Sequence, residues 1–279
     1  MKGCSMGEKT VGRRLEEAIL RLCCRNPAKG RYVPPELNLD TALSLLKTQF
    51  PGFLSSIVNR KVLDFGCGQG YQSLALGAEG ARKVVGVDID TRHLANAGEM
   101  ARQFGVADRV KFVEPSNLDS CGLFDVVLAY NSMEHFREPD VILREMSSRL
   151  APQGCLYISF GPPWYSPYGA HTIFFCKVPW IHLMFSEESV MSVRVNFTDD
   201  RATRYEDVRG GLNKMSLARF EWLVADAGME IEYCKYDYVL GLTFLENVPL
   251  LRELLIYHIS VILRPRTTLS SSVDPGAVQ

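Results

Sequence analysis

The sequence predicts a doubly wound α/β fold, in which a mostly parallel sheet is covered by helices on both faces. Apolar strand-like runs alternate with helix-like segments through the middle of the chain, as in folds of this class. The run Phe124–Tyr130 is apolar at nearly every position, as expected for a strand buried on both faces. Another run, Val62–Phe65, leads directly into a glycine-rich turn, Gly66–Gly70, and a helix-like segment follows.

The individual elements follow from local patterns along the chain. We expect strands at 61–65, 83–88, 109–113, 123–130, 154–160, 229–239 and 254–264. We expect helices at 71–80, 91–104, 138–150 and 216–227. Pro152–Gly154 is interpreted as the turn between the third of these helices and the fifth strand. Gly228 is the expected stop of the last helix.

The N-terminal part, residues 1–58, is expected to be a helical segment. Leu15 and Ile19 belong to a set of apolar residues that recur at the spacing of an amphipathic helix. We place that helix at 13–24 and a second one at 41–49.

The alternation of strands and helices stops after the fifth strand. Residues 161–212 are too apolar for a disordered linker and too irregular for another strand–helix unit. We therefore expect an insertion that packs over the carboxyl edge of the sheet and covers the substrate together with the N-terminal segment. The main domain would span 59–266, and the tail at 267–279, which is rich in Ser, Pro and Gly, is expected to be disordered.

Composition narrows the range of partners and compartments. The chain of 279 residues has a net charge of −1, which gives no global attraction to nucleic acid. No apolar run is long enough to span a membrane. The eight cysteines form neither a C-x-x-C pair nor a cluster with histidine. These features predict reduced thiols, no metal site and a cytoplasmic protein.

The spacing of the glycine-rich turn indicates which ligand it holds. Glycines recur at every second position of Gly66–Gly70, and Asp64 stands two positions before the first. A dinucleotide site would have G-x-G-x-x-G, and a P-loop would end in Gly-Lys-Ser/Thr; neither is present. The second predicted strand ends at Asp88, whose carboxylate can accept both hydroxyls of a ribose, and Ile89 can lie against a purine.

Together these motifs resemble the cofactor site of the class I S-adenosylmethionine-dependent methyltransferases, in their type 11-like, small-molecule branch. The resemblance runs from about Lys61 to Arg264 and includes the order of the elements. It implies a Rossmann-like, seven-stranded mixed sheet whose last two strands form an antiparallel hairpin at the edge. The implied cofactor is S-adenosyl-L-methionine.

The resemblance also assigns residues to that cofactor. Asp64 would organise the turn and help bind the amino group of the methionine part, and Asp88 would hold the ribose. Where the family often has an Asp for the adenine amino group, this chain offers Ser116 or Asn117. The expected cofactor-binding set is Asp64, Gly66, Cys67, Gly68, Gly70, Asp88, Ile89, Ser116, Asn117 and Asn131.

A hydroxyl acceptor needs a base, and histidine is the usual residue for that role. His171 is the first candidate because it lies in a loop of the insertion that prolines and glycines punctuate. The alternative for His171 is a hydrogen bond within its own loop. His135 follows the fourth strand and is the second candidate, with packing at a helix start as its alternative. Tyr130 is expected either near the sulfonium or in the core, and His182 is expected to be structural.

The aromatic and charged side chains of the insertion can be interpreted as structural residues or as substrate contacts. Most of its aromatic residues are expected to be core, and Trp164, Tyr165 and Tyr168 are the better substrate contacts. Arginines alternate with acidic residues between Arg194 and Arg209, which predicts a solvated, ion-paired face.

The expected reaction is methyl transfer to a small-molecule acceptor, most readily at oxygen. An amide or adenine-amine methyltransferase would carry Asn/Asp-Pro-Pro-aromatic after the fourth strand, where this chain has Asn131–Glu134. A metal-dependent methyltransferase of the catechol type would carry clustered acidic ligands near the fourth and fifth strands, and none are found there. A methyltransferase that acts through cysteine would carry Pro-Cys after the fourth strand, which this chain lacks. Two alternatives stay open, namely a protein or RNA methyltransferase and a catalytically silent partner subunit. The acceptor and the oligomeric state are not specified by these residues.

Overall fold

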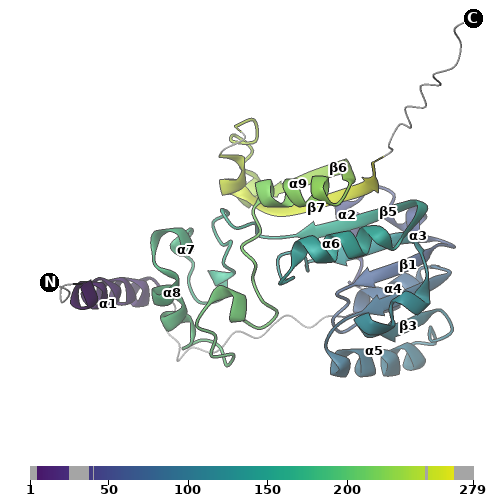
Figure 1. Cartoon of the computed structure of the whole chain (residues 1–279), viewed down its shortest axis with the longest axis horizontal. Coiled ribbons are helices and arrows are strands. Elements are labelled where there is room, and N and C mark those ends of the chain that lie inside the picture. The colour runs from purple at the N-terminus through teal and green to yellow at the C-terminus, as the bar shows by residue number, and fades with distance from the viewer. Residues whose placement is uncertain (1–4, 25–37, 40, 249–250, 267–279) are drawn as a thin grey trace, which may run out of the picture.

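The computed structural model describes residues 5–24, 38–39, 41–248 and 251–266. They contain a seven-stranded sheet of order β3-β2-β1-β4-β5-β7-β6 (Figure 1). The strands are β1 (Lys61–Phe65), β2 (Lys83–Val87), β3 (Val110–Val113), β4 (Phe124–Tyr130), β5 (Leu150–Phe160), β6 (Met229–Tyr238) and β7 (Ile256–Pro265). β7 is antiparallel to β5 and β6, and the other neighbours are parallel. The predicted Rossmann-like mixed sheet with an antiparallel edge hairpin is confirmed.

Helices cover both faces of this sheet, as predicted (Figure 1). They are α1 (Ser5–Cys23), α2 (Ser44–Gln49), α3 (Phe53–Ile57), α4 (Tyr71–Ala78), α5 (Thr91–Gln103), α6 (Pro139–Ser148), α7 (Ile181–Met184), α8 (Glu187–Arg194) and α9 (Leu217–Asp226). Successive strand residues point to opposite faces. Val127 therefore joins the core under α6 and α9, whereas Val126 and Leu128 join the core under α2, α3 and α4.

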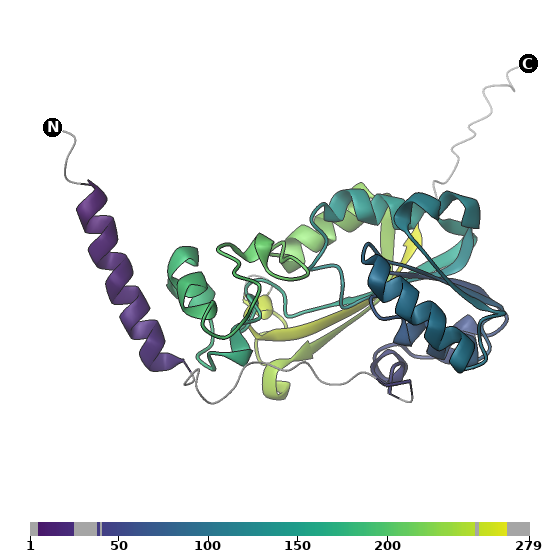
Figure 2. The ribbon, with the colours of Figure 1, turned by 90° about the horizontal axis from the view of Figure 1, so that it is seen from below.

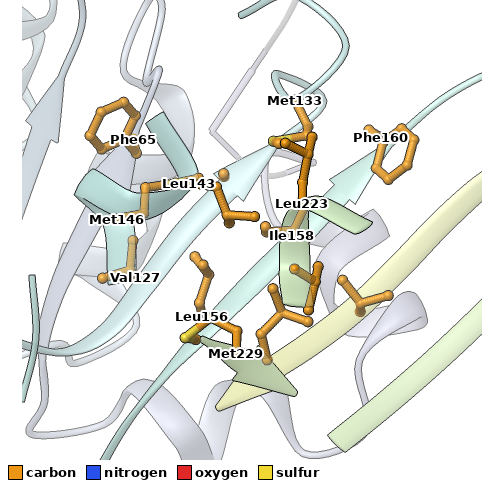
Figure 3. Packing of buried hydrophobic residues seen from close by; sticks show 14 of the residues in the cluster. Phe65, Val127, Met133, Leu143, Met146, Leu156, Ile158, Phe160, Leu223 and Met229 are labelled. Atoms are coloured by element: carbon orange, nitrogen blue, oxygen red, sulfur yellow. The ribbon is translucent and has the colours of Figure 1, made fainter. Parts of the chain in front are cut away.

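The core beneath α6 and α9 fixes the strands that carry the site. Leu143 and Met146 of α6 and Leu223 of α9 pack onto Leu156 and Ile158 of β5 (Figure 3). All five side chains are at most 2% exposed. Burial of one such side chain contributes about 1.5–3 kcal/mol, so this layer holds the carboxyl ends of β4 and β5 in place.

The two largest differences between predicted and observed element boundaries concern the first helix and the start of the fifth strand. The first helix begins at Ser5 instead of residue 13. β5 begins at Leu150, so the predicted helix is shorter at its end and Pro152–Gly154 lies within the strand. Leu150 pairs with Phe124, and the register then shifts before the next pair. Proline cannot donate a ladder hydrogen bond, which accounts for an irregularity at this point instead of a separating turn.

The insertion 161–212 folds around a cluster of its own. Phe175, Ile181 and Val190 are fully buried in it, and Leu20 of α1 completes it. α1 thus packs against α8 and away from the sheet, at one end of the molecule (Figures 1 and 2). Among the helices of the described residues, α1 included, none combines the length and the hydropathy of a membrane span. The predicted disordered tail, 267–279, lies outside the described residues.

Candidate cofactor and acceptor site

The glycine-rich turn after β1 has a backbone that side chains would obstruct. Gly66, Gly68 and Gly70 have φ angles of 76°, 50° and 79°, which glycine adopts at no steric cost. A Cβ at Gly70 would lie 2.7 Å from the ring of Phe112, so this position tolerates no larger residue without movement. The amides of Gly66 and Cys67 both donate to the Val87 carbonyl, at 2.8 and 3.0 Å. These bonds tie the turn to the end of β2.

Asp64 supports this turn from inside the protein. Its side chain is 3% exposed, and it accepts a hydrogen bond of 2.6 Å from the Ser73 hydroxyl in the first turn of α4. Burial raises the pKa of Asp64 to about 6, although the bond from Ser73 acts in the opposite direction. Asp64 therefore joins β1 to the helix that follows the turn.

Asp88 holds the second half of the turn. One carboxylate oxygen accepts from the amide of Gly68 at 2.8 Å, and the other accepts from the amide of Asp90 at 2.9 Å. Each carboxylate oxygen can accept more than one hydrogen bond, so both keep capacity for a ligand. The neighbouring Ile89 is 87% exposed, so its side chain is accessible to a ligand.

A cavity of about 920 Å³ opens at these residues. Gly66, Gly68, Asp88 and Ile89 form one part of its wall, and Asn131 at the end of β4 forms another. Its size lies within the range of about 300–1,000 Å³ that small-molecule sites occupy. A nucleoside joined to an amino-acid chain fits such a volume, and the open glycine backbone and the free acceptor capacity of Asp88 match its ribose side.

The predicted adenine contacts lie at the border of this cavity. Ser116 and Asn117 belong to a 3₁₀ turn, Pro115–Asn117, that follows β3. The side chains that line the cavity there are Pro115 and Leu118. Ser116 and Asn117 are not among the residues that line the cavity, so their contact with adenine stays a prediction. The two apolar side chains were not anticipated.

The end of β4 carries Asn131 in a left-handed conformation, with φ of 48°. Its side-chain oxygen accepts a hydrogen bond of 3.0 Å from Nε2 of His258 on β7, a residue that sequence reasoning missed. His258 lies opposite Asp237 in the β6–β7 pairing. Tyr130 is half-buried against the core on the α2 side, and burial raises the pKa of Tyr130 to about 12.

A second cavity, of about 510 Å³, lies between the sheet edge and the insertion. Tyr168, Phe174, Phe197 and Tyr257 give it aromatic walls. His135 lines both cavities, and Arg209 does so too. Of the aromatic residues predicted as substrate contacts, Tyr168 lines this cavity. Trp164 instead packs edge-on against His182, with ring centroids 4.8 Å apart.

The hydrogen bonds of His135 define its tautomer. Nδ1 lies 2.7 Å from the carbonyl oxygen of Gly211, and a carbonyl can only accept, so Nδ1 carries the proton. In the neutral ring, Nε2 is then the free acceptor. Nε2 lies 4.0 Å from Oε1 of Glu134, a side chain that is 2% exposed. Burial raises the pKa of Glu134, and the amide of Gly161 donates to its Oε1 at 3.2 Å.

His171 packs edge-on against His135, with ring centroids 5.4 Å apart. Its backbone has φ of 53°, an uncommon conformation outside glycine that costs about 1–3 kcal/mol. Burial and, to a smaller extent, the charge of His135 lower the pKa of His171 to about 3. Its Nε2 is buried and has no hydrogen-bond partner in the described part of the chain. His182, in contrast, donates from Nε2 to the carbonyl of Trp164 at 2.7 Å, which is a structural arrangement.

The predicted solvated face of arginines and acids is only partly correct. Arg194 and Asp200 do form an ion pair, with two bonds of 2.7 and 2.6 Å, but Arg194 is only 9% exposed. The Arg194 guanidinium holds the pKa of Asp200 well below its usual range. The pair lines the second cavity because α8 turns it inward, which a pattern of alternating charges cannot reveal.

Comparison with known proteins agrees with this geometry. Residues 9–234 match the family described as a methyltransferase domain, so the chain belongs to that family, the class I S-adenosylmethionine-dependent methyltransferases. It resembles the crystal structure of magnesium protoporphyrin IX methyltransferase from Synechocystis PCC 6803 with bound SAH. The TM-score is 0.52 at 15% identity, over 92% of this chain and 100% of that one.

Two curated relatives match a shorter stretch. The ubiquinone biosynthesis O-methyltransferase of Psychrobacter arcticus is 35% identical over 107 residues, which are 37% of this chain and 41% of that protein. The ribosomal protein L11 methyltransferase of Vibrio parahaemolyticus is 35% identical over 100 residues, which are 36% of this chain and 33% of that protein. The matched stretch thus spans less than half of either relative.

Proposed function

We propose that the protein transfers the methyl group of S-adenosylmethionine to an oxygen atom of a small-molecule acceptor. The observation that carries this proposal is that His135 lines both cavities, with Nε2 as its free acceptor nitrogen. The cofactor would occupy the first cavity and the acceptor the second.

The cofactor, when bound, supplies a methyl group that its sulfonium already activates. Gly66 and Gly68 would let the backbone approach it, and Asp88 would accept the ribose hydroxyls. Alignment of the two reactants and exclusion of water can lower the activation free energy by about 7–11 kcal/mol. The aromatic walls around the second cavity would provide that enclosure.

His135 is favoured over His171 as the base. Nε2 of His135 would take the proton of the acceptor hydroxyl, and Glu134 would stabilise the resulting imidazolium. A base works best when its pKa lies near the working pH. The lowered pKa of His171 makes it a weak base, and its unpaired Nε2 suits a hydrogen bond to the acceptor instead.

The alternative of a protein acceptor is supported by the similarity to the ribosomal protein L11 methyltransferase. The second cavity, at about 510 Å³, favours a small molecule because its rings form walls on several sides. We also propose a cytoplasmic location, since the cysteines of the described residues are all free thiols. A catalytically silent subunit remains the other alternative, and turnover decides it.

The experiment uses methyl-labelled S-adenosylmethionine, the purified chain, and a cell extract separated by size into small molecules, protein and RNA. Label in the small-molecule fraction, lost with His135→Ala, is the expected result. Label confined to protein or RNA would overturn the choice of acceptor. Absence of label from every fraction, with SAH still bound, would indicate the silent subunit.

A further inference from the structure

The structure brings together two cysteines that are far apart in the sequence. Cys24 follows the last residue of α1, and Cys176 lies in the insertion just after the 3₁₀ turn Thr172–Phe174. They form an isolated antiparallel bridge, so the two residues stand directly opposite each other. Opposed residues in such a bridge have Cα atoms about 4.5–5.5 Å apart. A disulfide spans about 4.4–6.8 Å between Cα atoms, so this separation already suits one.

The two thiols also interact. Cys176 is fully buried and Cys24 is partly exposed. The Cys176 thiol donates to the carbonyl oxygen of Cys23 at 3.6 Å, which holds it beside the end of α1. The contact between the two thiols raises the pKa of Cys24 and lowers the pKa of Cys176, so Cys24 loses its proton as it reacts.

We propose that Cys24 and Cys176 are a reversible dithiol site that reacts with low-molecular-weight disulfides. The exposed Cys24 sulfur attacks one sulfur of the disulfide RSSR, and the first RSH leaves with the Cys24 proton. The Cys176 sulfur then attacks the Cys24 sulfur, and the second RSH leaves with the Cys176 proton. One S–S bond is exchanged for another, the protein loses two hydrogens and the reagent gains them.

A disulfide between Cys24 and Cys176 would link the end of α1 covalently to the segment that forms one wall of the second cavity. In the reduced protein that contact rests on Leu20, which is fully buried, and on the hydrogen bond from Ser186 to Glu16. Ile173 and Phe174, which line the second cavity, lie three and two residues before Cys176. The crosslink would therefore fix α1 against the segment that forms this wall, and its formation does not depend on the nature of the methyl acceptor.

The test treats the reduced full-length protein with glutathione disulfide and maps its peptides by mass spectrometry without reduction. We expect a peptide that joins Cys24 to Cys176, two hydrogens lighter than the sum of its parts, and its loss on treatment with dithiothreitol. Cys23→Ser and Cys234→Ser remove two exposed thiols and should leave the crosslink unchanged.

Cys24→Ser should abolish the crosslink, and because Cys24 is partly exposed this variant is expected to fold. Cys176→Ser, at a buried position, should give the same result, and Cys24→Ser decides the test if that variant is unstable. Glutathione mixed disulfides without any linked peptide would overturn the proposal. A link that persists in Cys24→Ser and disappears in Cys23→Ser would overturn it as well, because Cys23 would then be the partner.

Discussion

The two cavities, which we propose for the cofactor and for the acceptor, are built in different ways. The first takes one wall from the glycine-rich turn after β1 and from the residues that follow β2, and another wall from the end of β4 and from α6. The second joins the end of β4, the loop around His171 and the segment around Arg209. The first cavity therefore contains a local motif, the glycine-rich turn and Asp88, whereas the second is assembled from side chains of segments that are distant in the sequence.

The largest expected effect comes from the residue shared by the two cavities. His135→Ala should lower kcat by about 10²–10⁴-fold, because the proton of the acceptor loses its base. Affinity for S-adenosylhomocysteine should change little. The measurement is steady-state kinetics with the acceptor found in the extract, together with calorimetric titration.

His171→Ala is the matched control for that substitution. It should act mainly on KM, since His171 is expected to bind the acceptor and not to take its proton. An equal loss of kcat in both variants would contradict the division of roles between the two histidines.

The ion pair of Arg194 and Asp200 lines the second cavity and is largely buried. Asp200→Asn leaves Arg194 charged and without its partner in the interior, which should cost about 3–5 kcal/mol of unfolding free energy. The control is Glu206→Gln, which breaks an exposed pair with Arg204 and should cost less than about 1 kcal/mol. Urea denaturation of the three proteins measures both. Equal stability of Asp200→Asn and wild type would show that the pair contributes nothing.

The same pair predicts a dependence of stability on pH. The folded-state pKa of Asp200 is depressed, so its contribution is present above the unfolded pKa of about 3.9 and is lost as pH falls through the lower folded value. Wild type should therefore lose stability relative to Asp200→Asn below about pH 4. Denaturation curves at pH 3 and pH 7 give the difference.

The glycine-rich turn offers a test within the cofactor side. Gly70→Ala combines backbone strain with a clash against Phe112, and should cost about 4 kcal/mol. Gly68→Ala has the same kind of φ angle with open space around the new methyl group, so about 1 kcal/mol is expected. Denaturation measures the difference, and equal losses would mean that contact with Phe112 is unimportant.

Most of the fold was predictable from the sequence, because strands and helices alternate with clear apolar periodicity. The element boundaries that were predicted incorrectly have local causes. Pro152–Gly154, for example, was interpreted as a turn but lies within β5. Gly66, Gly68 and Asp88 do line one cavity together, and their proximity was predictable because the turn after β1 and the end of β2 lie at the same edge of the sheet.

The acceptor side was less predictable. His258 reaches Asn131 only because β7 pairs with β5 next to β4, so no local signal in the sequence indicates the contact. The pairing of Cys24 with Cys176 depends on where α1 lies against the insertion. The roles of His135 and His171 depend on burial and on a bond to Gly211, which only the folded chain defines.

The central claim is that the turn after β1 and Asp88 form an S-adenosylmethionine site. Its most direct test is calorimetric titration of wild type, Asp88→Asn and Asp88→Ala with S-adenosylhomocysteine. Asp88→Ala removes two ribose bonds to a charged acceptor, each contributing about 1.5 kcal/mol, so affinity should fall about 100-fold. Asp88→Asn keeps an oxygen for the Gly68 amide and should fall less. Wild-type binding that Asp88→Ala leaves unchanged, or no binding by folded wild type, would contradict the account.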